Sequence, residues 1–284
     1  MNIPHHRRPL RLPSEAFSRA RWQWLCALVV AAFLFACAAA PDRTQQRAIE
    51  LGYVRLELEG SAFAHVAFFK PGEPRTSLHV YIEHDGIPWI TLTQPSADPT
   101  PRRLIMLEMM ASDSAPSLYL GRPCYFGLST RAPCEPIWWT HRRFSPEVVS
   151  SMNAAVSAFL ATNPHIERLE VYGFSGGGVL AVLMAPGIPQ TQRVITAAAP
   201  LDIDAWTTLH GYSTLAGSLS PMRQPPLAVR IAQLHLVGGR DDVVTIDMVR
   251  PFVERQSGAE LRSLETFDHH CCWERTWTSV ITPN

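Results

Sequence analysis

Short runs of apolar and alternating residues begin soon after residue 50 and predict strands. The first three runs cover residues 53–58, 62–69 and 78–82, and turn residues such as Gly60 and Pro71 separate them. No helix-like segment stands between these runs. We therefore expect hairpin-like strands at one edge of a sheet.

Farther along the chain, helix-like and strand-like segments alternate. A helix pattern at residues 102–111 leads to a short strand pattern at 118–120, and a long apolar helix face follows Ser145-Pro146, a typical helix start. Further strand patterns lie at residues 166–172, 194–199, 231–237 and 261–266. This alternation predicts an α/β fold with a mostly parallel sheet, covered by helices on both faces and mixed at the edge of the early strands.

The composition and motifs exclude several classes of partner and leave the predicted fold unchanged. The 284 residues can bury a large core, and 25 basic residues balance 25 acidic ones. The chain has no basic stripe, so we expect no nucleic-acid partner. It has no phosphate-binding loop or dinucleotide fingerprint, and its cysteines lack zinc-site spacing, so we expect no cofactor and no metal. The oligomeric state does not follow from the sequence.

The first 36 residues have the features of an export signal. Arginines cluster ahead of an apolar stretch at residues 22–36. That stretch is shorter than the roughly 20 residues of a spanning helix, which favours a signal peptide over a retained transmembrane helix. We therefore expect the mature protein to be exported.

The end of this stretch, Leu34-Phe35-Ala36-Cys37, resembles the lipobox of bacterial lipoprotein signals. Leucine stands three residues before the cysteine, and a small residue stands just before it. We expect residues 1–36 to be removed, Cys37 to carry lipid, and residues 37–48 to tether a domain of residues 49–284. The expected place is the cell envelope, on the periplasmic face of the outer membrane. An ordinary signal peptide cut near residues 38–40 is the alternative.

Four cysteines, Cys124, Cys134, Cys271 and Cys272, remain in the mature domain and allow three pairings. Export favours disulfides over free thiols. A bridge between Cys124 and Cys134 would close a loop of about ten residues and stabilise the fold by about 3 kcal/mol. The adjacent Cys271 and Cys272 would pair only with a distorted peptide between them.

Residues 173–177, Gly-Phe-Ser-Gly-Gly, carry the clearest chemical signal. They lie between a strand-like run and a helix-like run of small and apolar residues. This G-x-S-x-G pattern is typical of a sharp turn that lifts a serine hydroxyl above a sheet, where flanking glycines avoid steric overlap. We predict that Ser175 is a nucleophile, the competing interpretation being a glycine-rich turn.

A serine hydroxyl needs a base, and the base needs a carboxylate that orients it. The run at 231–237 ends in Gly-Gly-Arg-Asp-Asp, which would present Asp241 at the carboxyl edge of the sheet. Asp242 is the alternative, because only one of two successive loop residues can face the base. Asp202 is a further candidate, although it also suits the role of a helix cap before Trp206.

The base is expected near the carboxyl end, in the segment Phe-Asp-His-His-Cys-Cys-Trp at residues 267–273. It offers His269 and His270, of which we favour His269. The order serine, acid, histidine is that of a nucleophile-elbow hydrolase.

Two backbone amides should bind the oxyanion that forms on the substrate. One is the amide of Gly176, directly after the nucleophile. The other should follow the third strand, at Asp85 or Gly86, where a plain turn is the competing interpretation.

Taken together, these motifs resemble the α/β hydrolases, and within them a group of bacterial lipoprotein-like members. The resemblance covers the chain from about residue 53 onward. The matching segments are Tyr-Ile-Glu-His-Asp-Gly at 81–86, Gly-Arg-Pro-Cys at 121–124 and Asp-His-His-Cys-Cys-Trp at 268–273. It implies the α/β-hydrolase fold and a triad of Ser175, Asp241 and His269, but no defined substrate.

The chain departs from that group at three positions. His84 stands where glycine is expected, Pro200 where asparagine is expected, and Thr245 where proline is expected. His84 matters most, because a side chain beside the oxyanion loop can narrow it or change its reactivity.

Substrate size is harder to predict. The segment 202–226 is too short for a large lid, so only a short cap is expected. Trp138, Trp139 and Trp206 are candidates for an acyl pocket, although tryptophans at such positions more often belong to the core.

The sequence as a whole predicts an exported, lipid-anchored serine hydrolase that resembles a carboxylesterase and acts on a small-molecule acyl substrate. A thioesterase or peptidase of the same fold is an alternative. So is a non-catalytic surface lipoprotein that uses the fold as a binding scaffold, because fold alone does not establish activity.

Overall fold

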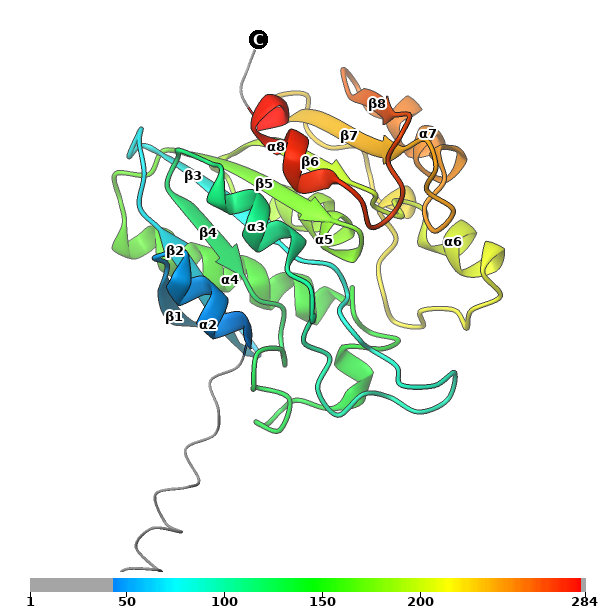
Figure 1. Cartoon of the computed structure of the whole chain (residues 1–284), viewed down its shortest axis with the longest axis horizontal. Coiled ribbons are helices and arrows are strands. Elements are labelled where there is room, and N and C mark those ends of the chain that lie inside the picture. The colour runs from blue at the N-terminus through cyan, green and yellow to red at the C-terminus, as the bar shows by residue number, and fades with distance from the viewer. Residues whose placement is uncertain (1–42, 282–284) are drawn as a thin grey trace, which may run out of the picture. The chain divides into compact units, whose positions relative to one another are not determined.

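The structure, a computed structural model, describes residues 43–281 and contains one eight-stranded sheet (Figure 1). Its strand order is β1-β2-β4-β3-β5-β6-β7-β8. The strands are β1 (Val54–Glu59), β2 (Ala64–Lys70), β3 (Ser77–Ile82), β4 (Ser117–Leu120), β5 (Arg168–Phe174), β6 (Thr191–Ala197), β7 (Ala232–Gly238) and β8 (Glu260–Leu264). Strand β2 is antiparallel to both neighbours, and all other pairs are parallel. The predicted mostly parallel sheet, mixed at the edge of the early strands, is confirmed.

Helices cover both faces of the sheet. They are α2 (Arg43–Glu50), α3 (Ile105–Ala111), α4 (Pro146–Thr162), α5 (Gly176–Met184), α6 (Ile203–Leu209), α7 (Ile246–Glu254) and α8 (Trp273–Ile281), with short 3-10 turns at Pro136–Trp138, Ala185–Gly187 and Pro221–Arg223. Figure 1 shows α3 and α8 in front of the sheet and α4 and α5 behind it. The described residues therefore form three layers.

Strand β3 shows how the sheet divides the core. Leu78, Val80 and Ile82 are fully buried on the face that α4 and α5 cover, whereas Tyr81 is buried on the face of α3 and α8. Successive side chains of a strand point to opposite faces. A strand that is buried on both faces therefore needs an almost continuous apolar run, which β3 provides.

Helix α4 begins where its sequence predicts. The Ser145 hydroxyl accepts a hydrogen bond from the Val148 amide at 3.4 Å, and Pro146 takes the first helical position. Val148, Met152 and Val156 then form a buried stripe at helical spacing.

The amino-terminal boundary differs from the expected one. Residues 43–48, which the sequence pattern assigns to a tether, form most of α2. Ala48 is fully buried, and the Arg47 guanidinium donates to both carboxylate oxygens of Glu108 at 2.6 and 2.9 Å. The helix is therefore part of the packed domain, although the polar composition of its sequence suggested a tether.

The predicted signal peptide and Cys37 lie outside the described residues. Within residues 43–281, no helix has the length and apolar character needed to cross a membrane.

Candidate active site

Ser175 occupies a sharp turn between β5 and α5. Its backbone has φ +51° and ψ −122°, and its amide donates to the Ala197 carbonyl at 2.8 Å. A positive φ is unfavourable for a residue with a side chain and costs about 1–3 kcal/mol, so the surrounding packing must hold it. This is the strand-to-helix elbow that the sequence predicts.

The glycines around Ser175 allow the elbow to pack closely. A Cβ atom at Gly173 would overlap the carbonyl of Gly177, and one at Gly177 would overlap the carbonyl of Ile82 at the end of β3. Both glycines are therefore required by close backbone approach.

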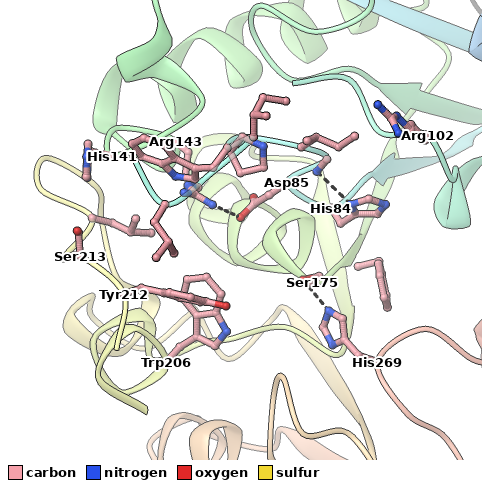
Figure 2. A pocket seen from close by; sticks show the side chains of 18 of the residues that line it. His84, Asp85, Arg102, His141, Arg143, Ser175, Trp206, Tyr212, Ser213 and His269 are labelled. Carbon is pink, nitrogen blue, oxygen red and sulfur yellow. Dashed lines mark hydrogen bonds and ion pairs between the residues drawn. The ribbon is translucent and has the colours of Figure 1, made fainter. Parts of the chain in front are cut away.

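A hydrogen-bonded chain joins Ser175 to a histidine and a carboxylate. The Ser175 Oγ lies 3.2 Å from Nε2 of His269 (Figure 2). Nδ1 of the same ring lies 2.9 Å from Oδ2 of Asp241. A carboxylate only accepts hydrogen bonds, so Nδ1 donates and Nε2 is left to accept from the serine hydroxyl. The Asp241 Oδ1 accepts from the amides of Val243 and Val244 at 2.9 and 2.8 Å, which fixes the carboxylate.

The alternative candidates for the acid and the base do not take part in this series of hydrogen bonds. Asp242 and His270 are exposed. The Asp202 carboxylate instead accepts from the amides of Asp204 and Ala205 at 3.2 and 3.1 Å, as the cap of α6. The structure thus brings Ser175, Asp241 and His269 together. The alternative residues are exposed or, in the case of Asp202, cap a helix.

The loop after β3 is held by His84. Nε2 of His84 lies 3.0 Å from the Arg103 carbonyl, which can only accept, so Nε2 donates and Nδ1 accepts from the Gly86 amide at 3.0 Å. Burial lowers the pKa of His84 to about 4, which keeps the ring neutral at neutral pH. Gly86 itself has φ +67°, a conformation that favours glycine. The Gly86 amide is therefore engaged by a side chain.

Asp85 is fixed in the same loop by three residues that the sequence reasoning did not single out. The Tyr125 hydroxyl donates to the Asp85 carbonyl at 2.7 Å, and the guanidinium groups of Arg122 and Arg143 both contact the Asp85 carboxylate. Burial alone would raise the pKa of Asp85, but the two arginines outweigh it and lower this pKa to about 2. Arg122 lies in the Gly-Arg-Pro-Cys segment, whereas Arg143 carried no recognisable signal.

Two backbone amides remain available beside Ser175. Gly176 is the first residue of α5, and the first amides of a helix have no partner within it. The Asp85 amide has no hydrogen-bond acceptor within residues 43–281. A Cβ atom at Gly176 would overlap the Asp85 carboxylate, so the two residues lie side by side.

No family model and no curated protein matches the sequence, but solved structures match the fold. An esterase from Pyrococcus furiosus gives a TM-score of 0.56 at 12% identity, over 82% of this chain and 92% of the esterase. A membrane phospholipase A, described as a bacterial virulence factor, gives 0.55 at 14% identity, over 89% of this chain and 92% of the phospholipase. The acylaminoacyl peptidase of Pyrococcus horikoshii gives 0.54 at 13% identity over 77% of this chain. The chain has the α/β-hydrolase fold.

At these identities the likeness concerns the fold alone. The chain also spans only 37% of the length of the acylaminoacyl peptidase. Three hydrolases of different kinds thus share the α/β-hydrolase fold with this chain, as the resemblance of its motifs implied.

A cavity of about 920 Å³ opens over Ser175 at the carboxyl edge of this α/β-hydrolase sheet. Its apolar lining consists of Ile87, Pro88, Trp89, Ile90, Leu92, Ile105, Phe174, Trp206, Tyr212 and Leu215. Of these residues, Leu92 is 91% exposed. Trp206 thus belongs to the cavity, whereas Trp139 is 2% exposed and donates its indole N–H to the Ser96 carbonyl at 3.1 Å.

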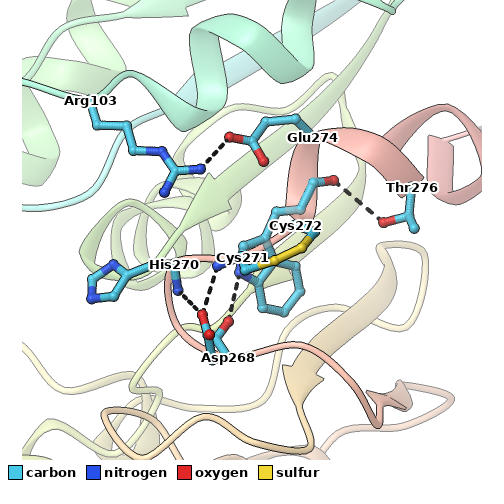
Figure 3. The surroundings of a disulfide bond; sticks show 8 residues. Arg103, Asp268, His270, Cys271, Cys272, Glu274 and Thr276 are labelled. Carbon is cyan, nitrogen blue, oxygen red and sulfur yellow. Dashed lines mark hydrogen bonds and ion pairs between the residues drawn. A yellow bond between two sulfur atoms is a disulfide. The ribbon is translucent and has the colours of Figure 1, made fainter.

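Hydrogen bonds and a disulfide fix the loop that contains His269 (Figure 3). The Asp268 carboxylate accepts from the amides of His270 and Cys271, each at 2.7 Å, and the Trp273 indole donates to the Asp268 carbonyl at 3.2 Å. Cys271 and Cys272 are joined as neighbours across a cis peptide. The His269 ring also packs on Phe174, beside the nucleophile.

Cys124 and Cys134 form the other disulfide, with Cα atoms 5.5 Å apart. The described residues contain no group of three or more His, Cys, Asp or Glu side chains that could hold a metal ion.

Proposed function

We propose that this protein is a serine hydrolase that transfers an acyl group to water through an intermediate on Ser175. The observation that carries the proposal is the chain from Ser175 Oγ through His269 to the buried Asp241 carboxylate. This arrangement on an elbow of the α/β-hydrolase fold is suited to nucleophilic catalysis.

In the first half-reaction, Ser175 Oγ attacks the substrate carbonyl carbon while its proton moves to Nε2 of His269. Asp241 holds the ring through Nδ1 and stabilises the imidazolium. The tetrahedral intermediate then collapses, and His269 returns the proton to the leaving group. Water, activated by the same ring, releases the acyl group from Ser175 in the second half-reaction.

The amides of Gly176 and Asp85 are the proposed donors to the oxyanion. Loss of one such donor typically costs about 3–4 kcal/mol of transition-state stabilisation. The Gly86 amide already donates to His84, so Asp85 suits this role better. The contacts of the Asp85 carbonyl and carboxylate then serve to hold its amide in place.

A carboxylic ester is the proposed substrate. The cavity offers both an apolar lining and polar groups beside Ser175, which fits an acyl substrate of moderate size. The fold neighbours include an esterase, a phospholipase and a peptidase. Cleavage of a thioester or a peptide by the same mechanism is the competing specificity.

A fluorophosphonate probe tests the nucleophile. The domain should be labelled and should hydrolyse para-nitrophenyl butyrate, and Ser175→Ala should abolish both activities. Ser213→Ala, which changes another serine of the same cavity, should remain labelled. Equal labelling of Ser175→Ala, or no labelling of the wild-type protein, would exclude the catalytic role and favour a binding scaffold.

Export is proposed from the arginines and the apolar stretch of the first 36 residues, and lipid anchoring from the lipobox at residues 34–37. On this proposal Cys37 carries the lipid and the domain faces the periplasm from the outer membrane. Radiolabelled palmitate should be incorporated by the wild-type chain and lost in Cys37→Ser. Label that persists in this variant would overturn the anchor.

A further inference from the structure

Two buried arginines share one carboxylate behind the oxyanion loop. Arg122 and Arg143 are 2% and 4% exposed, and both pair with Asp85. Within residues 43–281, neither arginine has another acidic partner. One positive charge in this group is therefore unbalanced.

Burying an unbalanced charge is unfavourable, because the charge loses its hydration without gaining a partner. One guanidinium is enough to balance the charge of the Asp85 carboxylate. The second positive charge therefore calls for another explanation, and an anion that arrives with the substrate would supply its partner.

The two arginines differ in what surrounds them. Arg122 is enclosed by protein: it donates to the Arg143 carbonyl at 3.0 Å and lies over the rings of Tyr125 and Phe144. It does not line the cavity. Its charge is thus closed off from a bound substrate.

Arg143 lines the cavity together with Ser175 (Figure 2). Its Nε donates to the Thr140 carbonyl at 2.6 Å and its Nη1 to Asp85 at 2.7 Å. Nη2 has no hydrogen-bond acceptor among the described residues. Two contacts thus hold the guanidinium in place, and a donor group remains for a ligand.

Apart from Asp85, the charged side chains that line the cavity are arginines. Asp85 is the only carboxylate in the described lining, whereas Arg102 and Arg103 line it in addition to Arg143. Arg103 pairs with Glu274 at 2.8 Å, while Arg102 has no acidic partner within residues 43–281. A cavity with such a charge balance attracts anions and concentrates them near the nucleophile.

We propose that Arg143 recognises an anionic oxygen group of the substrate, and that the preferred substrates are acyl esters that carry a carboxylate. The proposal rests on the proposed hydrolase function and adds the substrate class. The anionic group can belong to the acyl half or to the alcohol half, since both present the same chemistry to a guanidinium.

Two matched pairs of esters test the proposal and locate the charge. On the acyl side, the para-nitrophenyl monoester of adipic acid is compared with that of adipamic acid. On the alcohol side, para-acetoxybenzoate is compared with para-acetoxybenzamide. Each pair exchanges a carboxylate for an amide of nearly the same shape. In at least one pair, kcat/KM corrected for uncatalysed hydrolysis should favour the anion by about tenfold.

Arg122 provides the matched control for Arg143. Arg143→Gln should reduce this anionic preference to about one, and Arg143→Lys should keep part of it. Arg122→Gln also removes a partner of Asp85, so it should lower the rates of both esters while most of the preference remains. No preference in wild-type protein, or equal loss of preference in Arg122→Gln and Arg143→Gln, would overturn the proposal.

Binding to Ser175→Ala separates this proposal from the proposed function. Calorimetry with the same uncleaved esters should show the anionic preference and its loss in the double variant with Arg143→Gln. If no ester is hydrolysed but the preference in binding holds, the hydrolase function fails and the anion site stands. If hydrolysis depends on Ser175 but neither rates nor binding favour the anion, the function stands and the anion site fails.

Discussion

Asp241 and Asp242 are neighbours in sequence with opposite surroundings. The Asp241 side chain is fully buried against His269, whereas Asp242 is exposed. Asp241→Asn should keep the shape but favour the wrong tautomer of His269, so kcat on para-nitrophenyl butyrate should fall about 10³- to 10⁴-fold. Asp242→Asn should stay within about twofold of wild type. Similar losses in both variants would contradict the role of Asp241.

His84 stands where the resemblance of the sequence motifs led us to expect glycine. His84→Gly would leave the Gly86 amide and the Arg103 carbonyl without their present partners. The oxyanion loop should then be held less firmly, and we expect kcat to fall about tenfold while KM changes little. His84→Asn, whose side chain can accept from the Gly86 amide, should recover part of the loss. A kcat of His84→Gly equal to wild type would show that the loop does not depend on this ring.

The segment between β4 and α4 supplies Arg122 and Tyr125, which contact Asp85 in the oxyanion loop. The Cys124–Cys134 disulfide closes part of this segment. Replacing both cysteines by serine should lower the free energy of unfolding by about 3 kcal/mol, since the unfolded chain gains loop freedom.

Urea unfolding measures this loss. Reducing agent should lower the midpoint of the wild-type protein toward that of the double variant. The variant itself should respond much less to reductant. A variant as stable as the oxidised wild-type protein would contradict a stabilising role of the bridge.

For the domain as a whole, buried ionisable groups set the pH of greatest stability. Burial lowers the pKa of His65, His84 and His235 to about 4, from an ordinary value of 6.5. Burial raises the pKa of Glu83 to about 8, from 4.5. The histidines are therefore neutral and Glu83 is protonated in the folded state near pH 7.

These shifts act in opposite directions. Below pH 6.5 these three histidines bind protons in the unfolded chain but stay neutral in the folded domain. The free energy of unfolding therefore falls as the pH drops toward 4. Above pH 4.5 the unfolded Glu83 releases a proton that the folded state keeps, so its contribution is lost as the pH rises through 8. Each proton corresponds to at most about 1.4 kcal/mol per pH unit. The histidines outweigh Glu83 at acidic pH, and the maximum should lie near pH 6.5.

Urea unfolding between about pH 4.5 and 8.5 measures how the free energy of unfolding changes with pH. Glu83→Gln, which mimics the protonated side chain, should reduce the decline on the alkaline side. Stability that rises steadily through pH 8 would contradict the shift of Glu83, and a flat acidic side would contradict those of the histidines.

The order of elements and the position of the nucleophile were predictable because they depend on local sequence. Apolar runs and turn residues determined the α/β architecture, and the glycines around Ser175 predicted an elbow from steric requirements within a few residues. Boundaries were less certain: the helix expected from residue 102 begins at Ile105, and α2 begins within the expected tether. Helix ends depend on packing as well as on composition.

The sequence by itself thus determined the fold class, the elbow and a small set of candidate partners for Ser175. Only the tertiary structure distinguished Asp241 from Asp242 and His269 from His270, because the direction of adjacent loop side chains depends on distant contacts. It also placed Arg143 beside Asp85, 58 residues earlier in the chain. Such pairings arise when the sheet brings separate loops to one edge, and no local pattern records them.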